Sequence, residues 1–127
     1  MDWLKLVNLL RGHKVYLQTH NFPDPDALAS AYGMQVFLRA HGVETTICYS
    51  GEVETNSTKK MMDVFHIEAY EIDEITDMSQ EDYIVTIDSD SVIDKDALYN
   101  ILCPFAHQNI GAVAGDIHVQ NLDKGII

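Results

Sequence analysis

Four side chains of this sequence are of the types that bind metal ions: one histidine, His20, and three aspartates, Asp24, Asp26 and Asp88. The first three fall within seven residues, where the apolar run VYLQT stops and a segment rich in alanine begins. Asp88 follows a second apolar run, YIVTI, much later in the chain. One imidazole and three carboxylates suit Mn²⁺, with Mg²⁺, Co²⁺ or Zn²⁺ as alternatives. Carboxylates can also bridge two such ions, an arrangement that activates water for phosphoryl displacement.

Each of these residues alone also fits a structural role. Asp24 and Asp26 flank Pro25 and could simply cap the following helix, because Asp is a favoured N-cap and proline fits the first helical position. His20 could be a hydrogen-bonded loop histidine, and Asp88 could end a strand and start a turn. The metal hypothesis therefore depends on whether the fold brings the four side chains to one place.

The apolar pattern predicts an α/β fold of three layers, with a mainly parallel sheet and helices on both faces. A strand over 14–19, a helix over 27–41 and a strand over 43–49 span about 35 residues and form a parallel βαβ unit. Other patterns predict helices over 3–10 and 56–65 and strands over 68–72 and 82–88. In the helix over 56–65 the apolar stripe consists of Met61, Met62 and Phe65. Weaker patterns predict a helix over 94–102 and a strand over 111–118. Because the carboxyl ends of parallel strands share one edge, Asp88 is expected beside residues 20–26, called the corner below.

The length of 127 residues predicts a single domain over 1–127 with a substantial core. The formal net charge of −12 argues against binding to duplex nucleic acid or to an acidic membrane surface. An acidic protein that handles phosphates needs metal ions to supply positive potential.

Two cysteines outside any C-x-x-C pair indicate free thiols in a reducing compartment. No apolar run approaches the ~20 residues of a membrane span and no signal peptide is present, so we expect a cytoplasmic protein.

The segment HNFPDPDALAS, from His20 to Ser30, resembles the first motif of the DHH phosphoesterase family, H-x3-D-x-D-(A/S)-(I/L)-x-S. Asp88 after its apolar run is similar to the second motif of that family. The resemblance covers residues 14 to about 91. It implies metal-dependent hydrolysis of phosphoric ester or anhydride bonds. The branches that the chain most resembles are the oligoribonuclease and phosphoadenosine-phosphate phosphatase branch and the exopolyphosphatases.

The resemblance implies a role for each of the four residues. His20 and Asp24 would bind the first metal ion, and Asp26 would bind the second. Asp88 would bridge both ions and so act as a catalytic residue. Water between the ions, deprotonated at neutral pH, would attack phosphorus in line.

The third motif of the family, Asp-His-His, has a partial counterpart in Asp116-Ile117-His118. Ile117 stands where the family has a histidine that binds the second metal, and His118 stands where the other histidine contacts phosphate. The C-terminal substrate-binding domain of the family would lie beyond Ile127, so the chain is expected to be truncated relative to the family. Counting the remaining ligands, we expect one strong metal site and a second that is weak or absent.

Two functions follow from these residues. The first is metal-dependent hydrolysis of phosphoester or phosphoanhydride bonds in a small phosphorylated substrate or a short oligonucleotide. The alternative is a catalytically impaired module with the same fold that binds a metal ion or a nucleotide. An isolated domain of this kind could also form a homodimer to cover surface. A response-regulator receiver domain fits the length, but the chain lacks adjacent acids after its first strand and a well-placed lysine after its last.

Overall fold

The computed structural model describes residues 3–79, 81–86, 100 and 103–106. The chain divides into two compact units, one of Trp3–Val92 and the other of Met1–Asp2 with Ile93–Ile127. In the second unit the described residues include a short 3-10 helix, η2, at Cys103–Ala106. The first unit holds the predicted helices over 3–10, 27–41 and 56–65 and the sheet. The predicted strand over 111–118, and the predicted helix over 94–102 apart from Asn100, lie outside the described residues. The single domain over 1–127 stays a prediction.

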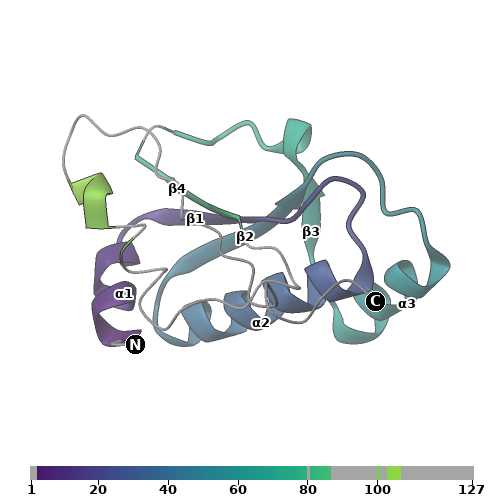
Figure 1. Ribbon diagram of the computed structural model, residues 1–127, viewed down its shortest axis with the longest axis horizontal. Helices are drawn as coiled ribbons and strands as arrows, with labels where there is room; N and C mark the ends of the chain where they lie inside the picture. Colours follow the sequence, from purple (N-terminus) through teal and green to yellow (C-terminus); the bar gives the residue numbers. More distant parts are fainter. Residues whose placement is uncertain (1–2, 80, 87–99, 101–102, 107–127) are drawn as a thin grey trace, which may run out of the picture. The chain divides into compact units, whose positions relative to one another are not determined.

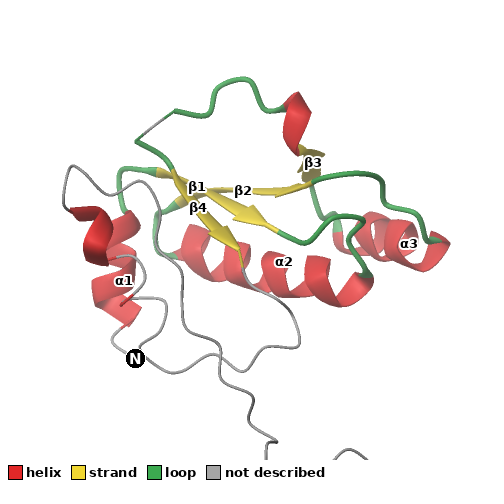
Figure 2. Ribbon diagram, turned by 45° about the horizontal axis from the view of Figure 1, so that its top comes forward, coloured by secondary structure: helices red, strands yellow, loops and turns green. Residues whose placement is uncertain are grey.

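The unit Trp3–Val92 consists of a parallel sheet and the helices that connect its strands. Its elements are α1 (Trp3–Leu10), β1 (Lys14–Gln18), α2 (Pro25–Ala40), β2 (Glu44–Tyr49), α3 (Asn56–Phe65), β3 (Ala69–Glu71), η1 (Ile72–Glu74) and β4 (Tyr83–Thr86). The strand order is β3-β2-β1-β4, and every strand pair is parallel. Helices α2 and α3 lie on one side of the sheet, and the chain that carries η1 passes on the other (Figures 1 and 2). The predicted α/β fold with a parallel sheet is confirmed.

β1 is one of the two inner strands of the sheet, with β2 on one side and β4 on the other. Its residues Val15, Tyr16 and Leu17 are all buried, so side chains on both of its faces belong to the core. Helix α2 covers this sheet with the buried side chains of Leu28 and Leu38. Because β1 is buried on both faces, the end of the strand, from which the corner at residues 20–26 begins, has a well-defined position.

Helix α1 packs beside α2. The rings of Trp3 and Phe37 meet edge to face, with their centroids 5.0 Å apart. The side chains of Leu6, Val7 and Leu10 are fully buried, whereas Leu4 is exposed, as an amphipathic helix requires. Within the part of the chain that the structure describes, no helix has the length and apolar character needed to cross a membrane.

Helix α3 differs from the prediction made for its apolar stripe. Among its side chains Thr58 alone is fully buried, Met61 and Met62 are partly exposed, and Phe65 is 58% exposed. The first turn of the helix is stabilised by a hydrogen bond of 2.6 Å between the side-chain hydroxyls of Thr58 and the N-cap residue Thr55. Because the helix packs through this turn, its last turn is left in solvent. Phe65, the last residue of the predicted apolar stripe, is therefore mostly in solvent, and Met61 and Met62 are only partly buried.

Burial protects one of the two thiols. Cys48 in β2 is fully buried, and burial raises the pKa of its thiol to about 11. At pH 8 only about one such thiol in a thousand is the reactive thiolate. We therefore expect a thiol reagent such as DTNB to modify Cys48 only as the protein unfolds, measured in a Cys103→Ser variant that removes the second thiol. Modification of the native variant at the rate of an exposed cysteine would contradict this prediction.

Candidate metal site

The corner joins the end of β1 to the start of α2, at the edge of the sheet where the strands end (Figure 1). Two backbone hydrogen bonds connect the corner, and the residue just before it, to β2 and the residue that follows β2. The N–H of Thr19 donates to the carbonyl of Cys48 at 3.0 Å, and the N–H of Phe22 donates to the carbonyl of Ser50 at 2.9 Å. The corner is therefore supported by the neighbouring strand and not only by its own turn.

The structure brings His20 and Asp24 together. Nε2 of His20 lies 3.6 Å from Oδ1 of Asp24, and both side chains are about half exposed. Nδ1 of His20 lies 2.9 Å from the carbonyl oxygen of Asn21. A carbonyl can only accept, so Nδ1 carries a hydrogen, and in the neutral imidazole Nε2 is then the basic nitrogen that faces the carboxylate. Metal-binding histidines are commonly oriented by such a hydrogen bond from the other ring nitrogen.

The pair fits a divalent cation. Ligand nitrogen and oxygen atoms lie about 2.0–2.2 Å from ions such as Zn²⁺. Two atoms 3.6 Å apart can share one cation at these distances. The exposure of His20 and Asp24 also gives an ion access from solvent. The types of the two donor atoms and the distance between them are therefore compatible with binding to a single ion.

Asp24 also caps α2, as the sequence predicted. Its Oδ1 accepts a hydrogen bond from the N–H of Ala27 at 2.8 Å, and Pro25 occupies the first helical position. A carboxylate has about four acceptor positions, so the cap uses a fraction of what the side chain offers. The capping role of Asp24 is confirmed, and it leaves room for a second role.

The remaining predicted site residues are not part of this pair. Asp26 is exposed in the first turn of α2, and side chains two residues apart on a helix do not face each other. Among the described residues, no three His, Cys, Asp or Glu side chains form a group able to hold a metal ion. Asp88 and His118 lie outside the described residues.

Sequence reasoning missed the contact between Phe22 and Gly51. Phe22 is 54% exposed, and its φ is 54°, in the left-handed region that aromatic residues rarely adopt. Gly51 has a φ of 86°, and a Cβ placed on it would lie 2.7 Å from Cε1 of the Phe22 ring. The signals in the sequence were an aromatic residue between two candidate ligands and a glycine two residues after the end of β2.

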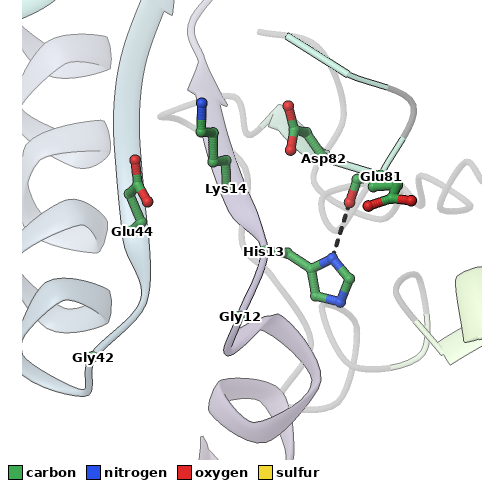
Figure 3. Close-up of a pocket in the computed structure, with 7 residues that line it drawn as sticks. All are labelled: Gly12, His13, Lys14, Gly42, Glu44, Glu81 and Asp82. Carbon is green, nitrogen blue, oxygen red and sulfur yellow. Dashed lines mark hydrogen bonds between the residues drawn. The ribbon is translucent and has the colours of Figure 1, made fainter. Parts of the chain in front are cut away.

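A hollow of about 390 Å³ lies at the opposite edge of the sheet, where β1, β2 and β4 begin (Figure 3). It is lined by Gly12, His13, Lys14, Gly42, Glu44, Glu81 and Asp82. Nδ1 of His13 donates to the carbonyl of Glu81 at 2.9 Å, and the Lys14 ammonium lies 2.5 Å from the Asp77 carboxylate. The hydrogen bond from Lys14 raises its pKa and lowers the pKa of Asp77. These contacts tie the connection between β3 and β4 to β1, which is a structural role.

Comparison with known proteins adds one relative. No family model matches the chain, and no solved structure matches it. An uncharacterized protein of Methanocaldococcus jannaschii is 32% identical over 71 residues. This match covers 56% of the present chain but 15% of that curated relative, so the chain spans a small part of the relative's length. The name of the relative gives no activity, so the resemblance to DHH phosphoesterases stays a prediction.

Proposed function

We propose that this chain carries a metal site of the DHH phosphoesterase type and takes part in metal-dependent hydrolysis of phosphoester or phosphoanhydride bonds. Its substrate would be a small phosphorylated molecule or a short oligonucleotide. The observation that supports this most directly is the pair of His20 and Asp24, with Nε2 facing Oδ1 at 3.6 Å. We propose Mn²⁺ as the ion, with Mg²⁺, Co²⁺ or Zn²⁺ as alternatives, and a cytoplasmic location, where both thiols stay reduced.

The charges of the corner support a requirement for a cation. Asp24 and Asp26 lie at the start of α2, and no Lys or Arg occurs between His20 and Leu38. The corner therefore offers a phosphate two carboxylates and no lysine or arginine of its own, and a bound cation would offset this negative charge. When bound, a divalent ion supplies Lewis acidity and lowers the pKa of a coordinated water.

The residues of the chain prepare the site for that ion. The Asn21 carbonyl holds the His20 imidazole in the tautomer that presents Nε2. The N–H of Ala27 fixes the Asp24 carboxylate, so neither ligand needs to be ordered when the ion binds. Asp88 is proposed to join them as the third ligand and as the bridge to a second, weaker ion.

The test is hydrolysis of p-nitrophenyl thymidine phosphate and of short oligonucleotides. We expect turnover with Mn²⁺, loss of turnover in EDTA, and recovery when Mn²⁺ is returned. Asp88→Ala should lower the rate by at least ~100-fold, because a metal ligand is removed. Asp63→Ala, which removes an exposed carboxylate from α3, is the matched control and should leave the rate unchanged. A rate insensitive to EDTA or to Asp88→Ala would contradict the proposal.

Ile117, which stands at a histidine position of the third family motif, favours a second candidate function. In this case the chain binds a metal ion or a nucleotide without turning it over. The same assay separates the two functions. Binding of a phosphate ligand without turnover, even at high Mn²⁺, would select the binding module.

A further inference from the structure

Phe22 occupies a position that packing alone does not explain. It lies between the two candidate ligands His20 and Asp24, and it is 54% exposed. Its φ of 54° places a bulky residue in a backbone region that normally favours glycine or asparagine. Its N–H donates to the carbonyl of Ser50, so the chain holds this conformation through a contact with the neighbouring strand segment.

The ring of Phe22 rests on Gly51. A Cβ on Gly51 would lie 2.7, 2.9 and 3.0 Å from Cε1, Cδ1 and Cζ, so one side of the ring touches backbone that carries no side chain. More than half of the residue's surface remains in solvent. The ring is therefore supported on one side and available on the other, which is the form of a stacking platform.

We propose that Phe22 is the base-stacking residue of the candidate metal site and that its substrates or ligands are nucleotides or short oligonucleotides. The proposal rests on the proposed function, because it places the phosphate at His20 and Asp24. Two residues span at most about 7 Å, so the Cα of Phe22 lies within that distance of the Cα atoms of His20 and Asp24. A nucleotide separates its base from its phosphate by one ribose, which suits a phosphate at the metal and a base on the ring.

The charge of the chain strengthens the case for stacking. With a net charge of −12, the chain has little electrostatic attraction for a polyanion apart from a bound cation. Stacking on an aromatic ring gives affinity that needs no positive charge and that tolerates any base, because every base has a π-face. Phe22 would thus distinguish nucleotides from other phosphate compounds by binding the base, while the metal ion binds the phosphate group that all of them carry.

The experiment compares AMP with ribose 5-phosphate, which lacks only the base, by calorimetric titration in Mg²⁺. We expect the native chain to bind AMP about 5- to 100-fold more tightly than ribose 5-phosphate. Phe22→Leu should remove this preference and leave the affinity for ribose 5-phosphate unchanged. Phe22→Trp should keep the preference, since the larger ring also stacks. Phe65→Leu changes an aromatic residue of similar exposure (58%) on α3 and should have no effect.

The outcomes separate this inference from the proposed function. Equal affinities of the native chain for the two ligands would overturn the stacking role, and this comparison needs no variant to fold. An AMP preference that survives in Phe22→Leu would overturn it as well. If the preference depends on Phe22 but no Mn²⁺-dependent hydrolysis occurs, stacking is supported and the hydrolase function fails. If hydrolysis occurs and Phe22→Leu leaves the KM for a dinucleotide unchanged, the hydrolase function stands and the stacking role fails.

Discussion

Replacing Asp24 by asparagine is expected to abolish metal-dependent hydrolysis while the protein stays folded. Asparagine caps helices about as well as aspartate, so the N–H of Ala27 keeps an acceptor at the start of α2. The amide has no negative charge, however, and is a much poorer ligand for a divalent cation that His20 also binds. We expect the Mn²⁺-dependent rate to fall by at least ~100-fold and the free energy of unfolding to change by less than about 0.5 kcal/mol.

Thr55→Ala is the matched control for this experiment. Thr55 caps α3 as Asp24 caps α2, since its hydroxyl accepts from the N–H of Thr58 at 3.3 Å. Loss of this cap should lower the free energy of unfolding by about 1 kcal/mol and leave the rate unchanged. Asp24→Ala should lower both the Mn²⁺-dependent rate and the free energy of unfolding. If Asp24→Asn retains full activity and metal affinity, Asp24 is a helix cap and nothing more.

The features of the fold that depend on local rules could be predicted from the sequence. The predicted strand over 14–19 is β1 at Lys14–Gln18, because an apolar run of this kind is buried wherever it lies in a parallel sheet. The N-cap of α2 was predicted from the sequence Asp24-Pro25, because capping depends on neighbours within four residues, although the predicted helix over 27–41 began two residues later than α2 does. His20 and Asp24 are close for a similar reason, since they are four residues apart in one turn.

The features that depend on distant neighbours could not be predicted. An apolar stripe indicates which side of α3 could be buried. How many turns of the helix are buried depends on where α3 lies against the sheet, and Phe65, in the last turn, is exposed. The contact of Phe22 with Gly51 joins residues 29 positions apart, through a left-handed backbone that no residue pattern at Phe22 indicates. Asp88 was placed by topology alone. Strand β4, which precedes Asp88 in the sequence, does lie next to β1, but Asp88 is outside the residues that the structure describes.

Gly51→Ala is expected to destabilise the protein more than the same change at Gly42. Both glycines have left-handed backbones, with φ of 86° and 79°, and alanine in this region costs about 1–2 kcal/mol. A Cβ at Gly42 meets nothing within 4 Å, whereas at Gly51 it meets the Phe22 ring. Overpacking of this kind adds about 1–3 kcal/mol, so we expect a total loss of about 2–5 kcal/mol at Gly51 against about 1–2 kcal/mol at Gly42 in urea unfolding.

The Phe22→Ala change tests whether the ring is the cause of this difference. If it is, adding Phe22→Ala to Gly51→Ala should bring the loss back to the value seen at Gly42, because the Cβ then meets open space. Because the Phe22 ring is exposed, it can rotate away from Gly51 and relieve part of the clash. This rotation would reduce the loss of stability, but the ring would then no longer be supported by the Gly51 backbone. In that case Gly51→Ala should weaken AMP binding as Phe22→Leu does, whereas Gly42→Ala should not. Equal stability losses at the two glycines together with unchanged AMP affinity would show that Gly51 does not support the ring.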